Sequence, residues 1–155
     1  MSAFDLDREW RMLGTTHPNI LVVGADAATD AALRALERIC RQPVVTRRAA
    51  DPLDLPSPSS SGTLILRDVD ALSLDNQGRL LTWLDEAQGR MQVITTTARE
   101  LSPLLETRAF LAALYYRLNI VYLNLPEEAD RGTRIYPKTR AAQVAPEARR
   151  RGTAA

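Results

Sequence analysis

The sequence contains a single cysteine, Cys40, and a single histidine, His17. One cysteine cannot form an internal disulfide, which fits a reducing compartment. His17 stands before Pro18 in a linker, without a second histidine or cysteine close by, so we expect no metal site. We interpret Cys40, late in an expected helix, as a packing residue rather than a nucleophile.

A strong net charge and long apolar runs are missing too. No apolar run approaches the length of a membrane span, and the first ten residues are too polar and acidic for a signal peptide. The net charge is +1, so no field of the whole molecule recruits nucleic acid or a membrane surface. We therefore expect a cytoplasmic protein with no cofactor and no membrane partner.

What the chain does have is a regular succession of short apolar runs and amphipathic segments. The pattern predicts strands at 20–24, 43–46, 63–68, 91–96 and 119–125, with helices at about 27–41, 73–88, 100–106 and 107–118. Strands that alternate with helices predict a parallel sheet covered on both faces. The expected fold is therefore α/β, with three layers and a five-stranded parallel sheet.

The flanking segments differ from this core in composition. Residues 1–16 form an N-terminal segment whose helix, at 4–13, either packs on the edge of the domain or docks another protein. Residues 17–126 form the α/β domain. Residues 127–155 form a basic tail that we expect to be disordered, or ordered only on a partner. The Pro- and Ser-rich residues 49–62 predict a mobile loop with little to bury.

The turn after the first strand has the place of a phosphate-binding loop but not its residues. The spacing G-x-x-x-x-G-K-[ST] supplies glycines that let backbone N–H groups converge, a lysine for phosphate charge and a hydroxyl for magnesium. Gly24 matches the first glycine, whereas Thr29, Asp30 and Ala31 replace the other three positions. A carboxylate at the lysine position repels phosphate, so we expect this loop to have lost its ligand chemistry.

The third predicted strand ends where a nucleotide-hydrolysing domain carries an Asp-Glu pair, which orders magnesium and polarises the attacking water. Here Arg67 takes the Asp position and Asp68 the Glu position. In an alternative register Asp68 is the metal ligand, and Val69 then stands where the base belongs. Neither register completes a catalytic site, so these positions predict a degenerate second motif.

Two long runs of the chain resemble a known family. GTLILRDVDALSLDNQGRLLTWLDE and MQVITTTARELSPLLETRAFLAALYYRLNIVYLNLP are similar to the AAA+ domain of bacterial sigma-54-dependent transcription activators, as is NILVVGADAATDAALRALERI. The run L-Y-Y-R-L-N at 114–119 is the most specific match, and the resemblance covers about residues 17–126. It implies a P-loop NTPase-like fold, the AAA+ α/β subdomain.

The departures from the family pattern are equally informative. The family's sensor asparagine falls on Ala98, and the first of two arginines that reach a neighbouring subunit's nucleotide falls on Leu111. The second is retained as Arg117, which we consider a possible subunit contact. The loop that contacts sigma-54 is replaced by the Pro/Ser segment. The lid subdomain and the DNA-binding helix-turn-helix that usually follow do not appear in this sequence.

These features together predict a truncated, degenerate relative of the family that is not an enzyme. We expect a regulatory or adaptor protein that binds another protein, either a sigma-54 activator or a second copy of itself. Nucleic acid could be contacted only through the basic tail. Two alternatives remain: a weak ATP-binding protein or ATPase that uses Asp68, and a receiver-like signalling pseudo-domain. Strand order separates these folds, since a P-loop core inserts a strand between its first two sequential strands.

Overall fold

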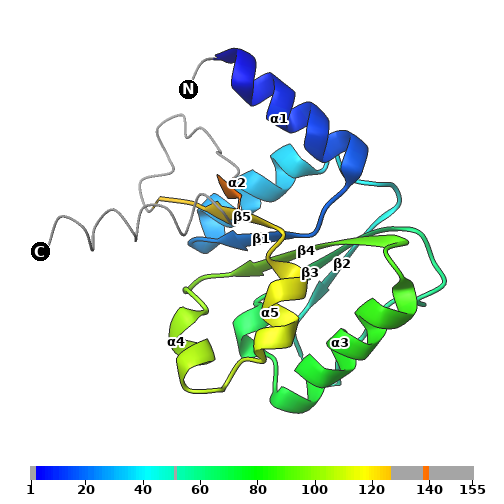
Figure 1. The fold of residues 1–155 in the computed structure, drawn as a ribbon, viewed down its shortest axis with the longest axis vertical. Helices are drawn as coiled ribbons and strands as arrows, with labels where there is room; N and C mark the ends of the chain where they lie inside the picture. The colour runs from blue at the N-terminus through cyan, green and yellow to red at the C-terminus, as the bar shows by residue number, and fades with distance from the viewer. Residues whose placement is uncertain (1–2, 51, 127–137, 140–155) are drawn as a thin grey trace, which may run out of the picture.

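The computed structural model describes residues 3–50, 52–126 and 138–139, and its centre is a six-stranded sheet of order β2-β3-β4-β1-β5-β6 (Figure 1). The first five strands run parallel, and β6 pairs antiparallel with β5. The strands are β1 (Ile20–Val23), β2 (Val44–Arg48), β3 (Gly62–Arg67), β4 (Met91–Thr97), β5 (Val121–Asn124) and β6 (Lys138–Thr139). The predicted five-stranded parallel sheet is confirmed.

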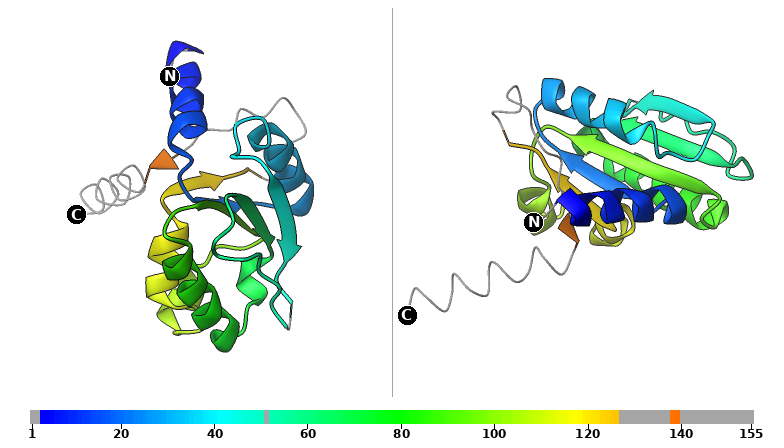
Figure 2. Two further views of the ribbon diagram at one scale, coloured as in Figure 1. Left: turned by 90° about the vertical axis from the view of Figure 1, so that its right-hand side faces the viewer. Right: turned by 90° about the horizontal axis from the view of Figure 1, so that it is seen from above.

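Helices cover both faces of this sheet, which gives three layers (Figure 2). One face carries α2, with α1 beside it, and the other carries α3, α4 and α5 (Figure 1). The helices are α1 (Ala3–Thr16), α2 (Asp26–Leu36), α3 (Leu74–Ala87), α4 (Ser102–Glu106) and α5 (Ala112–Leu118), with a short 3-10 turn, η1, at Val69–Ala71. The three-layer α/β architecture predicted from the sequence is therefore confirmed.

The side chains of β1 show why its sequence is a continuous apolar run. Ile20 and Val22 belong to the core under α1 and α2, whereas Leu21 and Val23 belong to the core under α3 and α5. Successive strand residues point to opposite faces, so a strand covered on both faces must be apolar throughout.

The strand order decides between the two predicted folds. β4 and β3 both lie between β1 and β2, so the first two strands in sequence are not neighbours. A flavodoxin-like or receiver-like sheet has the order 2-1-3-4-5, which places its first two strands side by side. The receiver-like alternative is therefore wrong, and the predicted insertion between the first two strands is confirmed.

Two helices are shorter than predicted. Helix α2 ends at Leu36 rather than near residue 41, so Cys40 lies beyond the helix instead of within it. Helix α5 begins at Ala112 rather than at 107. Arg108 adopts a left-handed φ of 62°, and the N–H of Phe110 bonds back to the carbonyl of Leu104, 3.0 Å away. These residues therefore turn the chain between α4 and α5.

The loop between β2 and β3 is attached to the domain, and we call residues 52–61 the proline strap. Leu53 is buried, and the indole N–H of Trp83 donates to the carbonyl of Pro56 at 2.7 Å. Arg90 Nε, just after α3, donates to the carbonyl of Pro58 at 3.2 Å. The prediction that this loop has little to bury is therefore wrong.

Helix α1 packs on the edge of the domain through its second half. Leu13 is buried against the α2 side of the sheet, with half-buried Trp10 one turn earlier, and the helix extends beyond the body of the molecule (Figure 2). Edge packing, one of the two predicted roles, is thus confirmed. No helix in the described part of the chain is long and apolar enough to cross a membrane. The predicted tail, 127–155, lies outside the described residues apart from β6.

Candidate functional site

The carboxyl ends of β1, β3 and β4 bring together the degenerate positions that the sequence predicted. Parallel strands present their carboxyl ends at one edge of the sheet, where ligands bind in folds of this kind. The positions gathered there are Gly24, Thr29, Asp30, Ala31, Arg67, Asp68 and Ala98.

The connection from β1 to α2 has no room for a phosphate-binding loop. Helix α2 starts at Asp26, so only Gly24 and Ala25 separate strand from helix. The N–H of Thr29 donates to the carbonyl of Ala25 at 2.9 Å, and its hydroxyl donates to the carbonyl of Gly24 at 3.1 Å. Thr29 is thus part of the first helical turn. Its N–H is consumed within the helix instead of being directed at a phosphate.

Gly24 is required by packing rather than by a ligand. A Cβ atom at this position would lie 2.8 Å from Cβ of Leu125, closer than side chains approach one another. The backbone is fixed as well, since the N–H of Gly24 donates to the carbonyl of Thr97 and that of Leu125 to the carbonyl of Val23. The single retained glycine of the motif is therefore explained by the close approach of the chain leaving β5.

The two degenerate motifs meet in one ion pair with reversed charges. Arg67 Nη2 lies 2.7 Å from Oδ1 of Asp30, and the two side chains are 18% and 50% exposed. An intact site has its cation on the helix and its carboxylate on the strand, whereas here the carboxylate is on the helix and the cation on the strand. The sequence predicted each substitution separately but missed their contact. The sequence did contain a signal for this contact, since Asp30 and Arg67 have opposite charges and occupy two positions that belong to one site.

Further ion pairs continue along this edge. Asp68, with a left-handed φ of 59°, pairs with Arg48 at the end of β2, and its N–H donates to Oγ1 of Thr96 at 3.3 Å. Asp70 pairs with Arg99 after β4, at 3.0 Å. The one carboxylate retained from the second motif is therefore held by an arginine. Within the described residues, no three His, Cys, Asp or Glu side chains gather as a metal site would require.

The remaining predicted positions have different surroundings. Ala98 is exposed just after β4 and has no side-chain group that could sense a phosphate. Arg117 lies away from the carboxyl edge, because its carbonyl accepts from Nδ2 of Asn19, which precedes β1. Its guanidinium pairs with Asp85 of α3. The structure therefore does not bring Arg117 together with the other predicted residues.

Cys40 behaves as the sequence predicted for a packing residue. It is 8% exposed, and burial raises the pKa of its thiol to about 11. A hydrogen bond with Thr63 opposes that rise, and the negative charge of Glu37 adds to it. The thiol therefore stays protonated at neutral pH, in a form that is a poor nucleophile.

Two solved structures illustrate the fold that this chain shares with other proteins. NtrX from Brucella abortus, solved in complex with ATP, superposes on 79% of this chain and 35% of its own, with a TM-score of 0.61 and 19% identity. The P-loop NTPase domain of a sigma-54 transport activator from E. coli superposes on 78% of this chain and 92% of its own, with a TM-score of 0.60 and 18% identity. These likenesses establish a P-loop NTPase fold.

Curated relatives match about half of this chain and a smaller part of their own. The probable regulatory protein HrpR of Pseudomonas syringae pv. syringae is 34% identical over 91 residues, which are 52% of this chain and 29% of HrpR. DctD of Pseudomonas aeruginosa, a C4-dicarboxylate transport transcriptional regulatory protein, is 32% identical over 85 residues, 48% of this chain and 18% of DctD. This chain thus spans less than a third of the length of either.

The family model described as the sigma-54 interaction domain matches residues 32–127. The match begins directly after Ala31, so it excludes the altered phosphate-loop positions. It includes the second-motif residues Arg67 and Asp68, the sensor position Ala98, and Arg117. The matched region exceeds half of the sequence, and the chain belongs to the family of sigma-54 interaction domains.

Proposed function

We propose that this chain is a non-catalytic member of its family that regulates transcription by binding another protein. The observation that carries the proposal is the charge-reversed Asp30–Arg67 ion pair. It occupies the cleft in which a nucleotide and its magnesium ion would require the opposite arrangement of charge. A domain that retains the fold but has the opposite charges at these two positions is better suited to binding a protein through its surface than to hydrolysing ATP.

Electrostatics supports the absence of nucleotide binding. A triphosphate in this cleft would bring its oxygens beside Asp30, and at about 4 Å a like-charge contact costs about 4 kcal/mol at an effective dielectric of about 20. Magnesium would meet Arg67 where it needs a carboxylate ligand. Binding would also have to break the existing ion pair. Each of these costs opposes the same ligand.

The family supplies the process in which such a protein would act. Relatives such as HrpR and DctD are named as regulatory proteins, and the E. coli neighbour as a sigma-54 activator. Domains of related structure can pack against one another, so an active sigma-54 activator is the partner we favour, with a second copy of this chain as the alternative. Co-purification from the native host, compared with Trp10→Ala and Arg117→Ala variants, would identify which partner is bound.

Isothermal titration calorimetry with ATP and magnesium tests the non-catalytic part of the proposal. We expect no saturable heat from this protein, under conditions in which NtrX of Brucella abortus, which has been solved in complex with ATP, serves as a positive control. Release of inorganic phosphate should stay at the level of buffer alone. Saturable ATP binding, or turnover by the pure protein, would contradict the proposal and favour the weak ATPase alternative based on Asp68.

A further inference from the structure

A groove between α1 and α2 has a different lining from the hollow beside the Asp30–Arg67 pair, although Arg34 contributes to both. It has a volume of about 470 Å³ and lies where α1 crosses beside α2 (Figure 1). Three half-buried side chains form its apolar part: Trp10 of α1, Ala35 of α2, and Ile39 just after α2. Arg34 and Arg38 are the other described residues of the lining. None of these five residues belongs to either degenerate motif.

The charged side chains that the structure describes in the lining of this groove have one sign. Arg34 and Arg38 are four residues apart, which places them on the same side of α2 and its following turn. Both are exposed, and neither forms an ion pair with another residue whose side chain the structure describes. The neighbouring hollow beside β2 differs, because Glu37 lines it together with the same arginines. Of these two hollows, the α1–α2 groove is the one in which the described lining combines arginines with apolar side chains and holds no carboxylate.

Tryptophan and arginine are the residue types most enriched where protein interfaces carry their binding energy. An amphipathic helix binds a groove of this kind by placing its apolar face on the floor. Carboxylates beside that face would form charge-assisted hydrogen bonds with the two guanidinium groups. Basic helices would meet like charge instead. The complementary occupant is thus both helical and acidic.

We propose that the α1–α2 groove is a docking site for an acidic amphipathic helix of a partner protein. The inference rests on the proposed function, in that it names the surface through which a protein without nucleotide chemistry would act. Trp10 and Ile39 contact the apolar face of the incoming helix. Arg34 and Arg38 select its acidic flank.

Synthetic helical peptides test this selection directly. Three peptides of about 20 residues, long enough to form a helix, share one apolar face at i, i+3, i+4 and i+7 and carry glutamate, lysine or glutamine elsewhere. Binding to the full chain is measured by fluorescence anisotropy of the labelled peptide. We expect the glutamate peptide to bind at least about tenfold more tightly than the lysine peptide.

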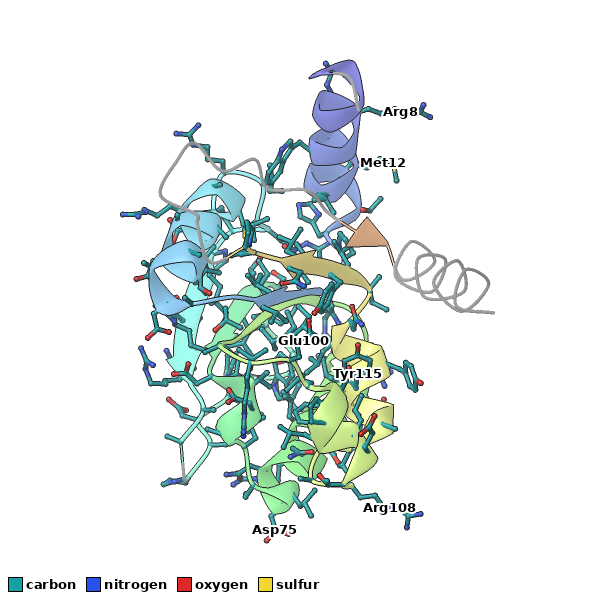
Figure 3. All side chains as sticks on the ribbon, turned by 90° about the vertical axis from the view of Figure 1, so that its left-hand side faces the viewer. Arg8, Met12, Asp75, Glu100, Arg108 and Tyr115 are labelled. Atoms are coloured by element: carbon teal, nitrogen blue, oxygen red, sulfur yellow. The ribbon has the colours of Figure 1, made fainter. Side chains whose placement is uncertain are left out.

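Two double variants locate the site. R34E/R38E should lose the glutamate peptide and gain affinity for the lysine peptide. R79E/R108E makes the same change of net charge elsewhere, and Arg108 lies at the far end of the molecule from Arg8 and Met12 of α1 (Figure 3). This control should bind the glutamate peptide as the parent chain does. Trp10→Ala should weaken all binding without reversing the preference, and circular dichroism would verify that each variant is folded.

Three results would overturn the proposal: equal affinity for all three peptides, equal loss of binding in both double variants, or no saturable binding of the glutamate peptide. None of them affects the ATP titration, so failure of the groove and failure of the non-catalytic function can be told apart. Conversely, an ATP-binding chain that still selected the acidic peptide would retain the docking site and lose the proposed function.

Discussion

Asp30 and Arg67 share one ion pair but differ in their contact with water. Asp30 is half exposed, whereas Arg67 is largely buried, and Arg67 Nε has no hydrogen-bond partner among the described residues. An exposed charge that loses its partner is resolvated by water, but a buried guanidinium is not. The two residues should therefore respond unequally to substitution, although they share the same contact.

We predict that Asp30→Ala lowers the free energy of unfolding by about 1 kcal/mol, because it leaves Arg67 buried without a partner. Arg67→Met should cost less, since an apolar side chain of similar length fills the same space and strands only an exposed carboxylate. Urea denaturation of both variants, and of the reversed pair D30K/R67D, would complete the comparison. The single variants D30K and R67D give the change in unfolding free energy expected if the two positions do not interact. If D30K/R67D is no more stable than the sum of these two changes, the contact contributes nothing.

Replacement of glycine by alanine should change the free energy of unfolding in opposite directions at Gly24 and at Gly78. At Gly24 a Cβ would meet Leu125, so we expect Gly24→Ala to destabilise the fold by about 1–3 kcal/mol through overpacking. Gly78 lies within α3 with nothing within 4 Å of the added Cβ, so Gly78→Ala should stabilise by about 0.5–1 kcal/mol. Thermal unfolding measures both. Partial rescue of Gly24→Ala by Leu125→Gly, which removes the Cβ atom at 2.8 Å, would identify the clash as the cause.

The proline strap is fixed to α3 by few contacts, of which the Trp83 indole N–H is the one most easily removed. Trp83→Phe keeps an aromatic ring but leaves the carbonyl of Pro56 without that donor, at a cost of about 1 kcal/mol. We predict faster proteolytic cleavage within residues 52–61 in this variant. Glu106→Ala, an exposed change on α4 outside the hollow that the strap lines, should leave the rate unchanged. Equal rates for Trp83→Phe and the parent chain would show that the strap is held by other contacts.

The sequence was sufficient to predict the strands and helices whose residue pattern depends on local structure alone. β1 and β4 were predicted correctly within a residue or so, because strands buried on both faces must be continuously apolar. The strap and the start of α5 were missed for a physical reason. Burial of Leu53 and the hydrogen bond from Trp83 join segments far apart in the sequence, and the turn at Arg108 depends on a left-handed backbone that an arginine rarely adopts.

The candidate site was predicted as a list of positions rather than as an arrangement. Resemblance to a family placed Asp30 and Arg67 at one edge of the sheet, but the sequence could not show that they touch. The start of α2 was predicted within one residue of Asp26, but the bond from the N–H of Thr29 to the carbonyl of Ala25, which leaves no loop, was not foreseen. Arg117 is a further example, because the sequence identified its motif but not its contact with Asp85.

For the molecule as a whole, an experiment can separate side-chain charge from backbone geometry as causes of the proposed loss of nucleotide binding. D30K/R67D restores the usual sign at both positions, yet the N–H of Thr29 remains bonded within α2. We therefore predict that this variant still shows no saturable ATP binding by calorimetry, because the backbone donors are not available. Binding at millimolar ATP or below would show that charge reversal alone had disabled the site.

Side chains of this chain tie the ends of β2, β3 and β4 to one another and to α2, at the edge of the sheet where ligands bind in folds of this kind. Under the proposed function, the cell would then have no way to switch such a protein through its ratio of ATP to ADP. Synthesis and degradation of the protein would then set the extent of its action, so its concentration in the cell would determine its regulatory effect.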